Sequence, residues 1–226
     1  MSAATDRVIA IDGPSGSGKS TVARGVSEAL GLEVLDTGAM YRAVTYAVIL
    51  AGADPASEGA ATAIVQGAAV TVIRGVTTLD GVDVSAEIRG PEVTATVSTV
   101  SAHPAVRAEL VGRQRCWVET HHGGVVEGRD IGSVVFPDAP VKVFLTASDD
   151  ERALRRQRDE IAAQRKVSVD ELRAAMATRD SADSTRVASP LLTADGATIV
   201  DTTGRTPEAV VAEIVQAFKR AEGSDG

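Results

Sequence analysis

Short apolar runs alternate along this chain with longer segments in which apolar residues recur every three or four positions. The apolar runs are typical of strands buried on both faces of a sheet, and they occupy residues 8–11, 33–35, 125–126, 141–145 and 197–200. The segments with the helical period are 19–30, 40–50, 206–219 and the region that begins at Asp149. This alternation predicts an α/β fold, in which helices flank a parallel sheet and ligands bind at the carboxyl ends of the strands.

Residues 68–89 interrupt this alternation. Three short runs rich in valine and threonine are separated there by Arg74-Gly75 and Asp80-Gly81, dipeptides typical of tight hairpin turns. We therefore expect a small antiparallel unit inserted into the α/β core. An alanine-rich helix is expected just before it, over residues 56–69, and the polar tail, residues 221–226, is expected to be disordered.

Composition and charge limit the classes of protein that remain. The 226 residues fit a single domain, here residues 1–226, and no apolar run approaches the roughly 18 residues needed to span a membrane. The N-terminal residues lack a secretory pattern, so we expect a cytoplasmic protein without membrane contact. The single Cys116 excludes an internal disulfide, and the net charge of −8 argues against nucleic acid as a partner.

The first apolar run leads directly into a glycine-rich segment that fits the GxxxxGK(S/T) pattern of a phosphate-binding loop. Its residues are Gly13, Pro14, Ser15, Gly16, Ser17, Gly18, Lys19, Ser20 and Thr21. The backbone N–H groups of such a loop surround phosphate oxygens, and the helix that follows directs its positive end toward the same anion. We therefore expect a nucleoside triphosphate here, with Lys19 at its β and γ phosphates and the Ser20 hydroxyl on Mg²⁺.

A second anion site is expected opposite this loop if the phosphoryl group is transferred to a small acceptor. The segment 36–42 follows the second apolar run and opens a helix, where it supplies Thr37, Gly38, Tyr41 and Arg42. A helix N-terminus with a hydroxyl, a phenol and a guanidinium nearby can bind a phosphate. The segment 127–130, Glu-Gly-Arg-Asp, follows a third run and would bring another arginine and a carboxylate to the same crevice.

Three functional classes are compatible with these motifs. A nucleoside monophosphate kinase and a kinase for another small molecule both need the second anion site, whereas a non-catalytic nucleotide-binding or switch module does not. Residues 201–204 match the DxxG pattern of switch GTPases. The chain contains no asparagine, so it lacks the Asn-Lys-x-Asp motif with which those proteins read guanine. These observations favour a kinase.

Five segments make the chain similar to the bacterial-type cytidylate kinases, a family of P-loop nucleoside monophosphate kinases. They are residues 11–16 (IDGPSG), 35–42 (LDTGAMYR), 84–89 (VSAEIR), 127–132 (EGRDIG) and 135–142 (VFPDAPVK). The resemblance runs over nearly the whole chain. It implies transfer of the γ-phosphoryl group of ATP to CMP or dCMP, with Mg²⁺, in pyrimidine nucleotide metabolism.

The same resemblance implies how the chain is divided. A monophosphate-binding region is expected over about 37–110, with the β insertion at about 68–89, and a helical lid over about 150–186. We expect a monomer whose partners are small-molecule nucleotides.

The resemblance also implies roles for individual residues. Those that would hold the phosphate of CMP are Thr37, Tyr41, Arg42 and Arg129. Those that would read the cytosine are Ser98, Arg107, Asp130 and Arg186, and those that would contact the sugar are Arg179 and Asp183. The residues that would act on the transferring phosphoryl group are Lys19, Arg129 and the lid arginines Arg152, Arg155 and Arg156. The chain departs from some members at Thr37 and Glu127, where they have serine and aspartate, but both changes keep the functional group.

Cytosine and uracil differ in the group that they would present to Asp130. Cytosine offers an amino donor, which a carboxylate accepts, whereas uracil would turn an acceptor toward it. A site built on buried hydrogen bonds can reject such a mismatch by roughly 10⁴-fold. CMP is therefore the expected acceptor, and UMP or a similar acceptor is the alternative. Two roles stay open for Asp12 and Asp36: each lies near the magnesium ion and its waters, or each fixes the geometry of a turn.

Overall fold

A five-stranded parallel sheet lies at the centre of the computed structural model, which describes residues 4–223. Its strands are β1 (Val8–Asp12), β2 (Val34–Asp36), β6 (Gly124–Gly128), β7 (Val141–Thr146) and β8 (Thr198–Asp201), in the order β2-β6-β1-β7-β8. β1 is the middle strand, so Ile9 pairs with Val125 on one side and with Val141 on the other. The predicted parallel sheet is confirmed, and each strand coincides with a predicted apolar run to within a few residues.

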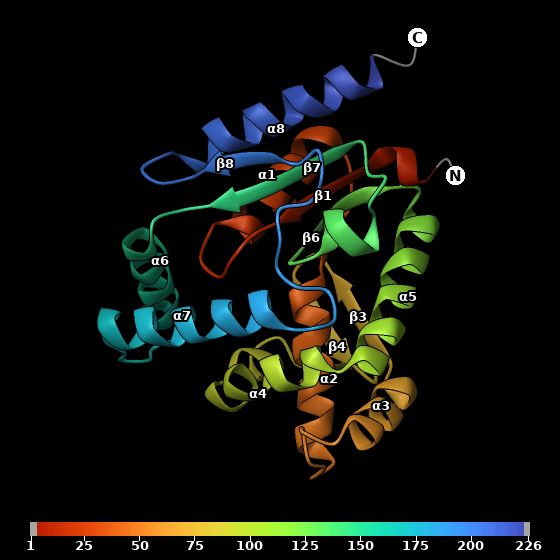
Figure 1. The fold of residues 1–226 in the computed structure, drawn as a ribbon, viewed down its shortest axis with the longest axis vertical. Coiled ribbons are helices and arrows are strands. Elements are labelled where there is room, and N and C mark those ends of the chain that lie inside the picture. The colour runs from red at the N-terminus through yellow and green to blue at the C-terminus, as the bar shows by residue number, and fades with distance from the viewer. Residues whose placement is uncertain (1–3, 224–226) are drawn as a thin grey trace.

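Helices cover both faces of this sheet. The principal covering helices are α1 (Lys19–Leu30), α2 (Thr37–Leu50), α5 (Pro104–His121) and α8 (Pro207–Glu222). β1 divides its side chains between two cores: Ile9 and Ile11 point toward α1 and α8, whereas Val8 and Ala10 belong to the core shared with α2 and α5. Figure 1 shows α8 above the sheet and α2 below it. A strand buried on both faces in this way explains the continuous apolar run.

The contact between α8 and the sheet provides a test of the core. Phe218 of α8 is 1% exposed and belongs to the same apolar cluster as Ile11. Phe218→Ala is expected to lower the free energy of unfolding by about 3–5 kcal/mol, because it removes a buried ring and leaves a cavity. Urea unfolding followed by circular dichroism measures this change. The control is Ile199→Ala on β8, where Ile199 is 63% exposed and the loss should stay below about 0.5 kcal/mol. Equal losses in the two variants would contradict the expectation.

The inserted unit is a three-stranded antiparallel sheet, as predicted. Its strands are β3 (Val70–Ile73), β4 (Val76–Leu79) and β5 (Val82–Asp83), and α3 (Glu58–Gly67) precedes it. Both hairpin dipeptides are left-handed, with φ of 48° at Arg74, 83° at Gly75, 51° at Asp80 and 83° at Gly81. Two consecutive left-handed residues are typical of the type I′ turn, whose twist matches that of the strands it joins.

The apolar pattern did not predict α4 (Pro91–Ala102), α5 or the π-helical turn Ile131–Val135. α5 lacks a continuous apolar stripe because its buried residues include Arg107 and Gln114. Both helices begin at a proline, a residue suited to the first turn of a helix, and this was the available sequence signal. Buried polar side chains thus concealed α5 from a search for hydrophobic period, whereas α4 does bury Val93, Val97 and Val100 at helical spacing.

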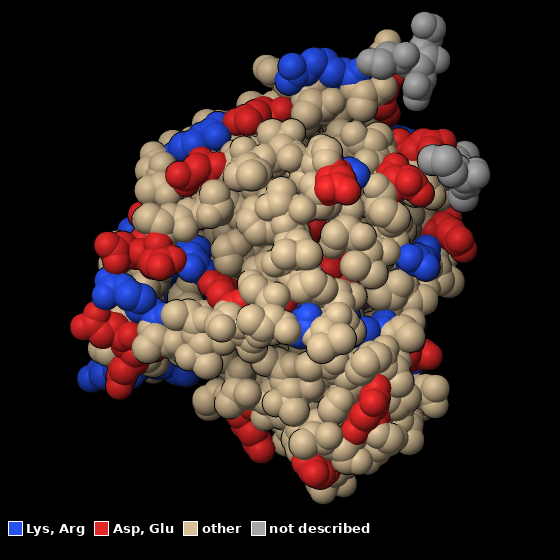
Figure 2. All heavy atoms as spheres, in the orientation of Figure 1, with Lys and Arg blue, Asp and Glu red and all other residues tan. Residues whose placement is uncertain are grey.

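The region after β7 forms two helices that pack against each other, α6 (Asp149–Ala162) and α7 (Val169–Thr185). α7 runs between the sheet and α4, and it contacts α4 (Figure 1). Acidic and basic side chains gather over the outer ends of α6 and α7 (Figure 2). These helices therefore present a strongly charged surface beside the carboxyl end of the sheet.

α8 continues beyond its predicted end, to Glu222. The expected disorder of residues 221–226 is therefore wrong for the first part of that segment, and residues 224–226 lie outside the described residues. Across residues 4–223, no helix has the length and apolar character needed to cross a membrane.

Candidate active site

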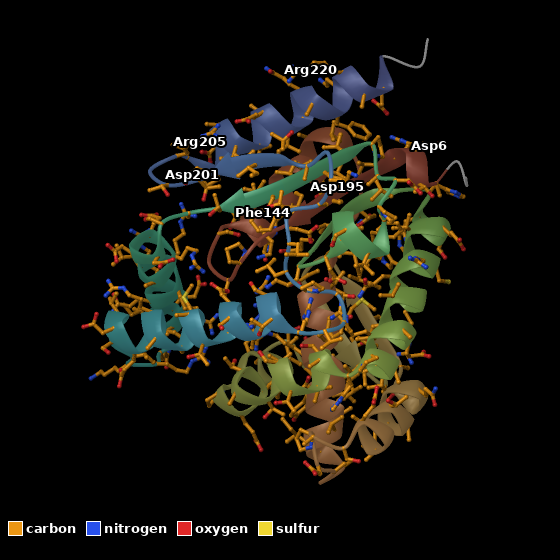
Figure 3. All side chains as sticks on the ribbon, in the orientation of Figure 1. Asp6, Phe144, Asp195, Asp201, Arg205 and Arg220 are labelled. Atoms are coloured by element: carbon orange, nitrogen blue, oxygen red, sulfur yellow. The ribbon has the colours of Figure 1, made fainter. Side chains whose placement is uncertain are left out.

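A cleft of about 530 Å³ opens at the carboxyl end of the parallel sheet. Its walls come from the phosphate-binding loop, the first turn of α2, the segment after β6, helices α6 and α7, and the loop between β8 and α8. Figure 3 shows Asp201 and Arg205 at that last loop, and Arg205 lines the cleft. The volume is in the usual range for a ligand-binding cleft, and ligands of open α/β sheets bind at this edge.

The phosphate-binding loop has a backbone that requires glycine. Gly13 has a φ of 149°, and a Cβ atom there would lie 2.1 Å from the carbonyl oxygen of Leu145. Gly18 has a φ of 93° and caps the N-terminus of α1. Lys19, in the first turn of α1, donates from Nζ to the carbonyl oxygen of Pro14 at 2.8 Å. The lysine is thus held inside the loop, where an incoming phosphate would compete with a carbonyl for its ammonium group.

Acidic and basic groups meet beside Ser20. Its Oγ donates to Oε2 of Glu127 at 3.1 Å, and Glu127 lies close to Lys19 and Asp36. Burial lowers the pKa of Lys19, and the neighbouring Arg129 lowers it further. Burial also raises the pKa of Glu127, and repulsion by Asp36 raises it further. This part of the cleft therefore holds charges that water does not stabilise.

Binding of ATP is expected to depend on pH through Lys19. Burial lowers the pKa of this lysine to about 7, and a bound phosphate favours its charged form. Above pH 7, binding must therefore take up a proton, and the Kd for metal-free ATP is expected to rise by up to about tenfold per pH unit between pH 7 and 9. Isothermal titration calorimetry in two buffers that differ in ionisation enthalpy measures the affinity and the proton uptake together.

Lys19→Arg is the matched control for this pH dependence, because a guanidinium keeps its proton to a higher pH than an ammonium group in the same surroundings. Its affinity for ATP should stay level from pH 7 to 9. A level profile without proton uptake in the unaltered protein would contradict the expected behaviour of Lys19.

Arginines crowd the cleft opposite the loop, where the lining includes Arg42, Arg129, Arg156 and Arg179. Burial lowers the pKa of Arg42 to about 9, with a contribution from repulsion by Arg179 and Arg156. Burial and repulsion by Arg129 lower the pKa of Arg179 to about 10. Buried positive charges that repel one another favour a bound anion.

The first turn of α2 lies against this arginine group. Asp36 caps the helix, since its Oδ1 accepts the N–H of Ala39 at 2.9 Å. Thr37 Oγ1 donates to the carbonyl oxygen of Glu127 at 2.7 Å. Arg42 donates from its guanidinium to a backbone carbonyl oxygen and to a threonine hydroxyl, each at 2.9 Å. These bonds hold the start of α2 beside the end of β6.

A buried charged group that includes Asp130 lies next to the arginines. Asp130 is 4% exposed and forms an ion pair with Arg107 of α5, while Arg186 lies 3.7 Å from its other oxygen. The guanidinium of Arg107 lies over the ring of Tyr41, 5.2 Å from the ring centre. Burial raises the pKa of the Tyr41 hydroxyl to about 12, so the phenol stays neutral. In this buried group the carboxylate of Asp130 can accept hydrogen bonds, and the planar guanidinium groups of Arg107 and Arg186 can donate them.

Asp183 of α7 connects this group with the arginines. It accepts a hydrogen bond from Nε of Arg129 at 3.0 Å, and it lies 3.7 Å from Arg186 and 4.0 Å from Arg179. All of the predicted acceptor-binding residues except Ser98 line the one cleft.

Ser98 and Arg152 lie apart from the cleft lining. Ser98 is half-buried on α4, where its carbonyl oxygen accepts from the hydroxyl of Ser101 at 3.3 Å, and Ser101 lines the cleft instead. Arg152 contacts the phosphate-binding loop: it donates to the carbonyl oxygen of Ser15 at 3.0 Å and pairs with Asp180. The sequence did not single out Ser101, which lines the cleft one helical turn beyond Ser98.

Arg155 and Arg156 of α6 do line the cleft, and both are paired. Arg155 donates to the hydroxyl and the carbonyl oxygen of Thr202 at 2.9 Å, and Arg156 pairs with Glu160 at 2.5 Å. Thr202 lies in the segment that matched the DxxG pattern. Its Oγ1 is 3.1 Å from the carbonyl oxygen of Ser17, so this segment packs against the phosphate-binding loop.

Asp12 at the end of β1 accepts the N–H groups of Ile131 and Gly132, each at 2.8 Å. Burial raises its pKa to about 6, although the two N–H groups act in the opposite direction. The sequence left two roles open for Asp12 and Asp36. The contacts of Asp12 and the helix cap that Asp36 makes correspond to the second role, in which each residue fixes the geometry of a turn.

A phosphate-binding loop that shares one cleft with a second, arginine-rich anion site defines the class of P-loop kinases. The sequence profile described as cytidylate kinase matches residues 9–220. The chain belongs to the cytidylate kinase family, and the resemblance expected from the sequence motifs is confirmed.

Relatives match nearly the whole chain. A cytidylate kinase from Mycobacterium leprae is 49% identical over 220 residues, which cover 97% of this chain and 99% of that protein. One from Mycobacterium avium is 50% identical over 210 residues, covering 91% of this chain and 92% of its own. A solved structure of an uncharacterized protein from Eubacterium ventriosum aligns with a TM-score of 0.52 at 12% identity, over 94% of this chain and 98% of that one. That structure shows a shared fold alone.

Proposed function

We propose that this enzyme transfers the γ-phosphoryl group of ATP to CMP or dCMP, giving ADP and CDP or dCDP, in pyrimidine nucleotide metabolism. The observation that carries the proposal is the buried Asp130, held by Arg107 and Arg186 in the same cleft as the phosphate-binding loop. A carboxylate can accept the amino group of cytosine, and arginines can donate to its carbonyl oxygen and ring nitrogen. The relatives named cytidylate kinase, at 49% and 50% identity, support the same acceptor.

The remaining residues divide between the two nucleotides. The donor phosphates would lie on the loop, residues 13–21, with Lys19 at the β and γ phosphates. The acceptor phosphate would be held by Thr37, Tyr41, Arg42 and Arg129, and the sugar would be contacted by Arg179 and Asp183. Ser98 stays in the proposed set for the base, and we add Ser101, which lies one helical turn further along α4 and lines the cleft.

The acceptor needs little activation. Its phosphate has a second pKa of about 6, so near neutral pH it is an anion that can attack without a general base. An oxygen of this phosphate forms the new P–O bond, the bond between the γ phosphorus and the bridging oxygen breaks, and ADP keeps the electron pair. Catalysis then depends on alignment of the two nucleotides and on neutralisation of charge by Lys19, Arg129 and the α6 arginines.

The groups around Ser20 fit a magnesium ion. The Ser20 hydroxyl and the Glu127 carboxylate are hard oxygen donors 3.1 Å apart. Magnesium in such sites takes only one or two protein oxygens, since substrate phosphates and waters supply the others. When bound with ATP, the ion would neutralise charge on the β and γ phosphates. Ser20 would hold it directly, with Glu127 beside it.

We further propose that residues 150–186 act as a lid over the monophosphate-binding region, residues 37–110. Arg155 and Arg156 line the cleft from α6 and could move from their present partners to a phosphoryl group. Closure would exclude water, which could otherwise accept the phosphoryl group. We also propose that the enzyme is a monomer and that it acts in the cytoplasm.

The test is ADP formation from ATP and Mg²⁺ with CMP, dCMP, UMP, AMP, GMP and shikimate offered in turn. CMP and dCMP are expected to support turnover well above the others. Preference for UMP would favour the alternative acceptor. The absence of acceptor-dependent ADP, from protein shown to be folded, would contradict this proposal and point to another acceptor or to a nucleotide-binding module.

A further inference from the structure

We propose that Asp12 is a positioning residue that sets acceptor specificity by fixing the orientation of Asp130. The inference rests on the proposed reading of cytosine by Asp130. Asp12 is 3% exposed and is absent from the cleft lining, although its charge lies near those of Lys19 and Asp130. We infer that it acts on the acceptor through the groups that it holds.

Both carboxylate oxygens of Asp12 bind the turn that follows Asp130. Oδ1 accepts the N–H of Ile131 and Oδ2 accepts the N–H of Gly132, each at 2.8 Å and buried. These N–H groups belong to the first two peptide units after Asp130, so their directions constrain the backbone from which its side chain projects. Hydrogen bonds to a charged acceptor are stronger than neutral ones, and buried N–H groups without a partner are costly.

The backbone at Asp130 belongs to no regular element. Its φ of −145° and ψ of 24° lie outside the helix and strand regions. Its carbonyl oxygen accepts the N–H groups of Val134 and Val135 in the π-helical turn Ile131–Val135. Turns of this kind are rare and often occur at functional sites. The side chain of Asp130 is therefore directed by whatever anchors this turn.

Gly13, the residue after Asp12, anchors the other side of Asp130. Its carbonyl oxygen accepts a hydrogen bond from the guanidinium of Arg129 at 3.0 Å. Two consecutive residues of the chain thus hold the residues on both sides of Asp130. Because β1 is paired along both edges, with β6 and β7, Asp12 lies on a strongly constrained part of the sheet. The same strand end therefore shapes the donor loop and the turn that would read the base.

The carboxylate is the group that this arrangement requires. Asparagine at position 12 could accept one N–H with its oxygen but would turn its own NH₂ group toward the other. The variant Asp12→Asn keeps the size of the side chain and removes one of the two anchors. We therefore expect it to loosen the turn while it leaves the core volume unchanged.

The experiment is a double-mutant cycle on acceptor preference, with kcat and KM measured for CMP and UMP at saturating ATP and Mg²⁺. Asp12→Asn is expected to lower the ratio of kcat/KM for CMP to that for UMP by at least about tenfold, mainly through a higher KM for CMP. In the Asp130→Ala background, the same change is expected to alter the ratio by less than about twofold, because the residue through which Asp12 acts is gone.

Ile214→Val is the stability control. Ile214 is fully buried on α8, in the other core, so this change should lower the melting temperature and leave the CMP-to-UMP ratio unchanged. Equal losses with CMP and UMP in Asp12→Asn would overturn the inference, and so would an equally large fall of the CMP-to-UMP ratio when Asp12→Asn is made in the Asp130→Ala background.

The experiment also covers a variant that does not fold, and it separates failure of the proposed function from failure of the inference about Asp12. If Asp12→Asn does not fold, Asp12→Ser takes its place in the cycle with the same expected results, because a serine hydroxyl can still accept one N–H. If the unaltered enzyme does not prefer CMP to UMP, the proposed function fails, and the inference about Asp12 fails with it. A preference for CMP that Asp12→Asn leaves intact would overturn the inference alone.

Discussion

Lys19→Ala is expected to lower kcat with CMP by about 10³-fold, the size of effect that follows removal of one preorganised charge from a phosphoryl-transfer site. The lysine is buried in the phosphate-binding loop, where burial and the neighbouring Arg129 lower the pKa of its ammonium group. In the transition state, the negative charge that develops on the transferring phosphoryl group would lie close to the positive charges of Lys19 and Arg129, in a site with little water. Removal of the ammonium therefore costs more in the transition state than in the bound ground state.

Steady-state kinetics with a coupled ADP assay measure this effect. Lys219→Ala is the matched control, because Lys219 is exposed on α8 and distant from the cleft lining. It should leave kcat within about twofold of the unaltered enzyme. A Lys19→Ala variant that keeps most of its kcat and changes only KM for ATP would show that the lysine binds the donor without stabilising the transition state.

Asp130→Ala is expected to lower kcat/KM for CMP by at least about 100-fold and to leave the value for UMP nearly unchanged. The carboxylate is buried between Arg107 and Arg186, and the amino group of cytosine is the donor that it can accept. Removal of Asp130 leaves the amino group without an acceptor and the buried guanidinium of Arg107 without its counter-charge. The preference for cytosine should therefore be lost before the ability to transfer a phosphoryl group.

The control for this variant is Asp138→Ala, since Asp138 is an exposed aspartate in the segment after the π-helical turn. It should change neither value of kcat/KM by more than about twofold. Thermal unfolding of both variants separates a loss of stability from a loss of recognition. An equal fall with CMP and UMP in Asp130→Ala would exclude a role for Asp130 in reading the base.

Several groups that line the cleft already have hydrogen-bond or ion-pair partners in this structure. Asp130 is bonded to Arg107, Arg155 to Thr202, and Arg156 to Glu160. Nucleotides would have to exchange these partners for their own phosphate and base groups. Such exchange favours ligands that present matching groups, because a mismatched ligand leaves a buried charge without compensation.

Local signals predicted the parts of the molecule in which a few adjacent residues determine the conformation. Gly13 and Gly18 adopt the backbone that the loop pattern implied, and Asp80-Gly81 forms the tight turn expected of that dipeptide. The apolar runs became strands because a strand covered on both faces must be apolar at every position. In these cases the sequence pattern and the structure express the same steric or solvation constraint.

Other features depended on contacts between distant residues. α5 was not predicted because Arg107 and Gln114 occupy its buried face, and the charge of Arg107 is compensated there by Asp130, with Tyr41 beneath its guanidinium. The sequence also did not indicate that Arg152 pairs with Asp180 of α7 and contacts the phosphate-binding loop, while its expected action on the phosphoryl group stays a prediction. No sequence period records such pairs, since their energies depend on where the partner lies in space.

The sequence by itself determined the class of this protein: the loop at residues 13–21, the parallel α/β order, the antiparallel insertion and the family to which the chain belongs. Each of these follows from residues that are near neighbours in the chain or from an apolar period. Only the tertiary structure decided which side chains face the cleft, that Ser101 lines it while Ser98 does not, and that Asp12 anchors the turn after Asp130. The reason is physical: hydrogen bonds and buried charges act over a few ångströms in space, and residues 12 and 131 come within that range only after the sheet has formed.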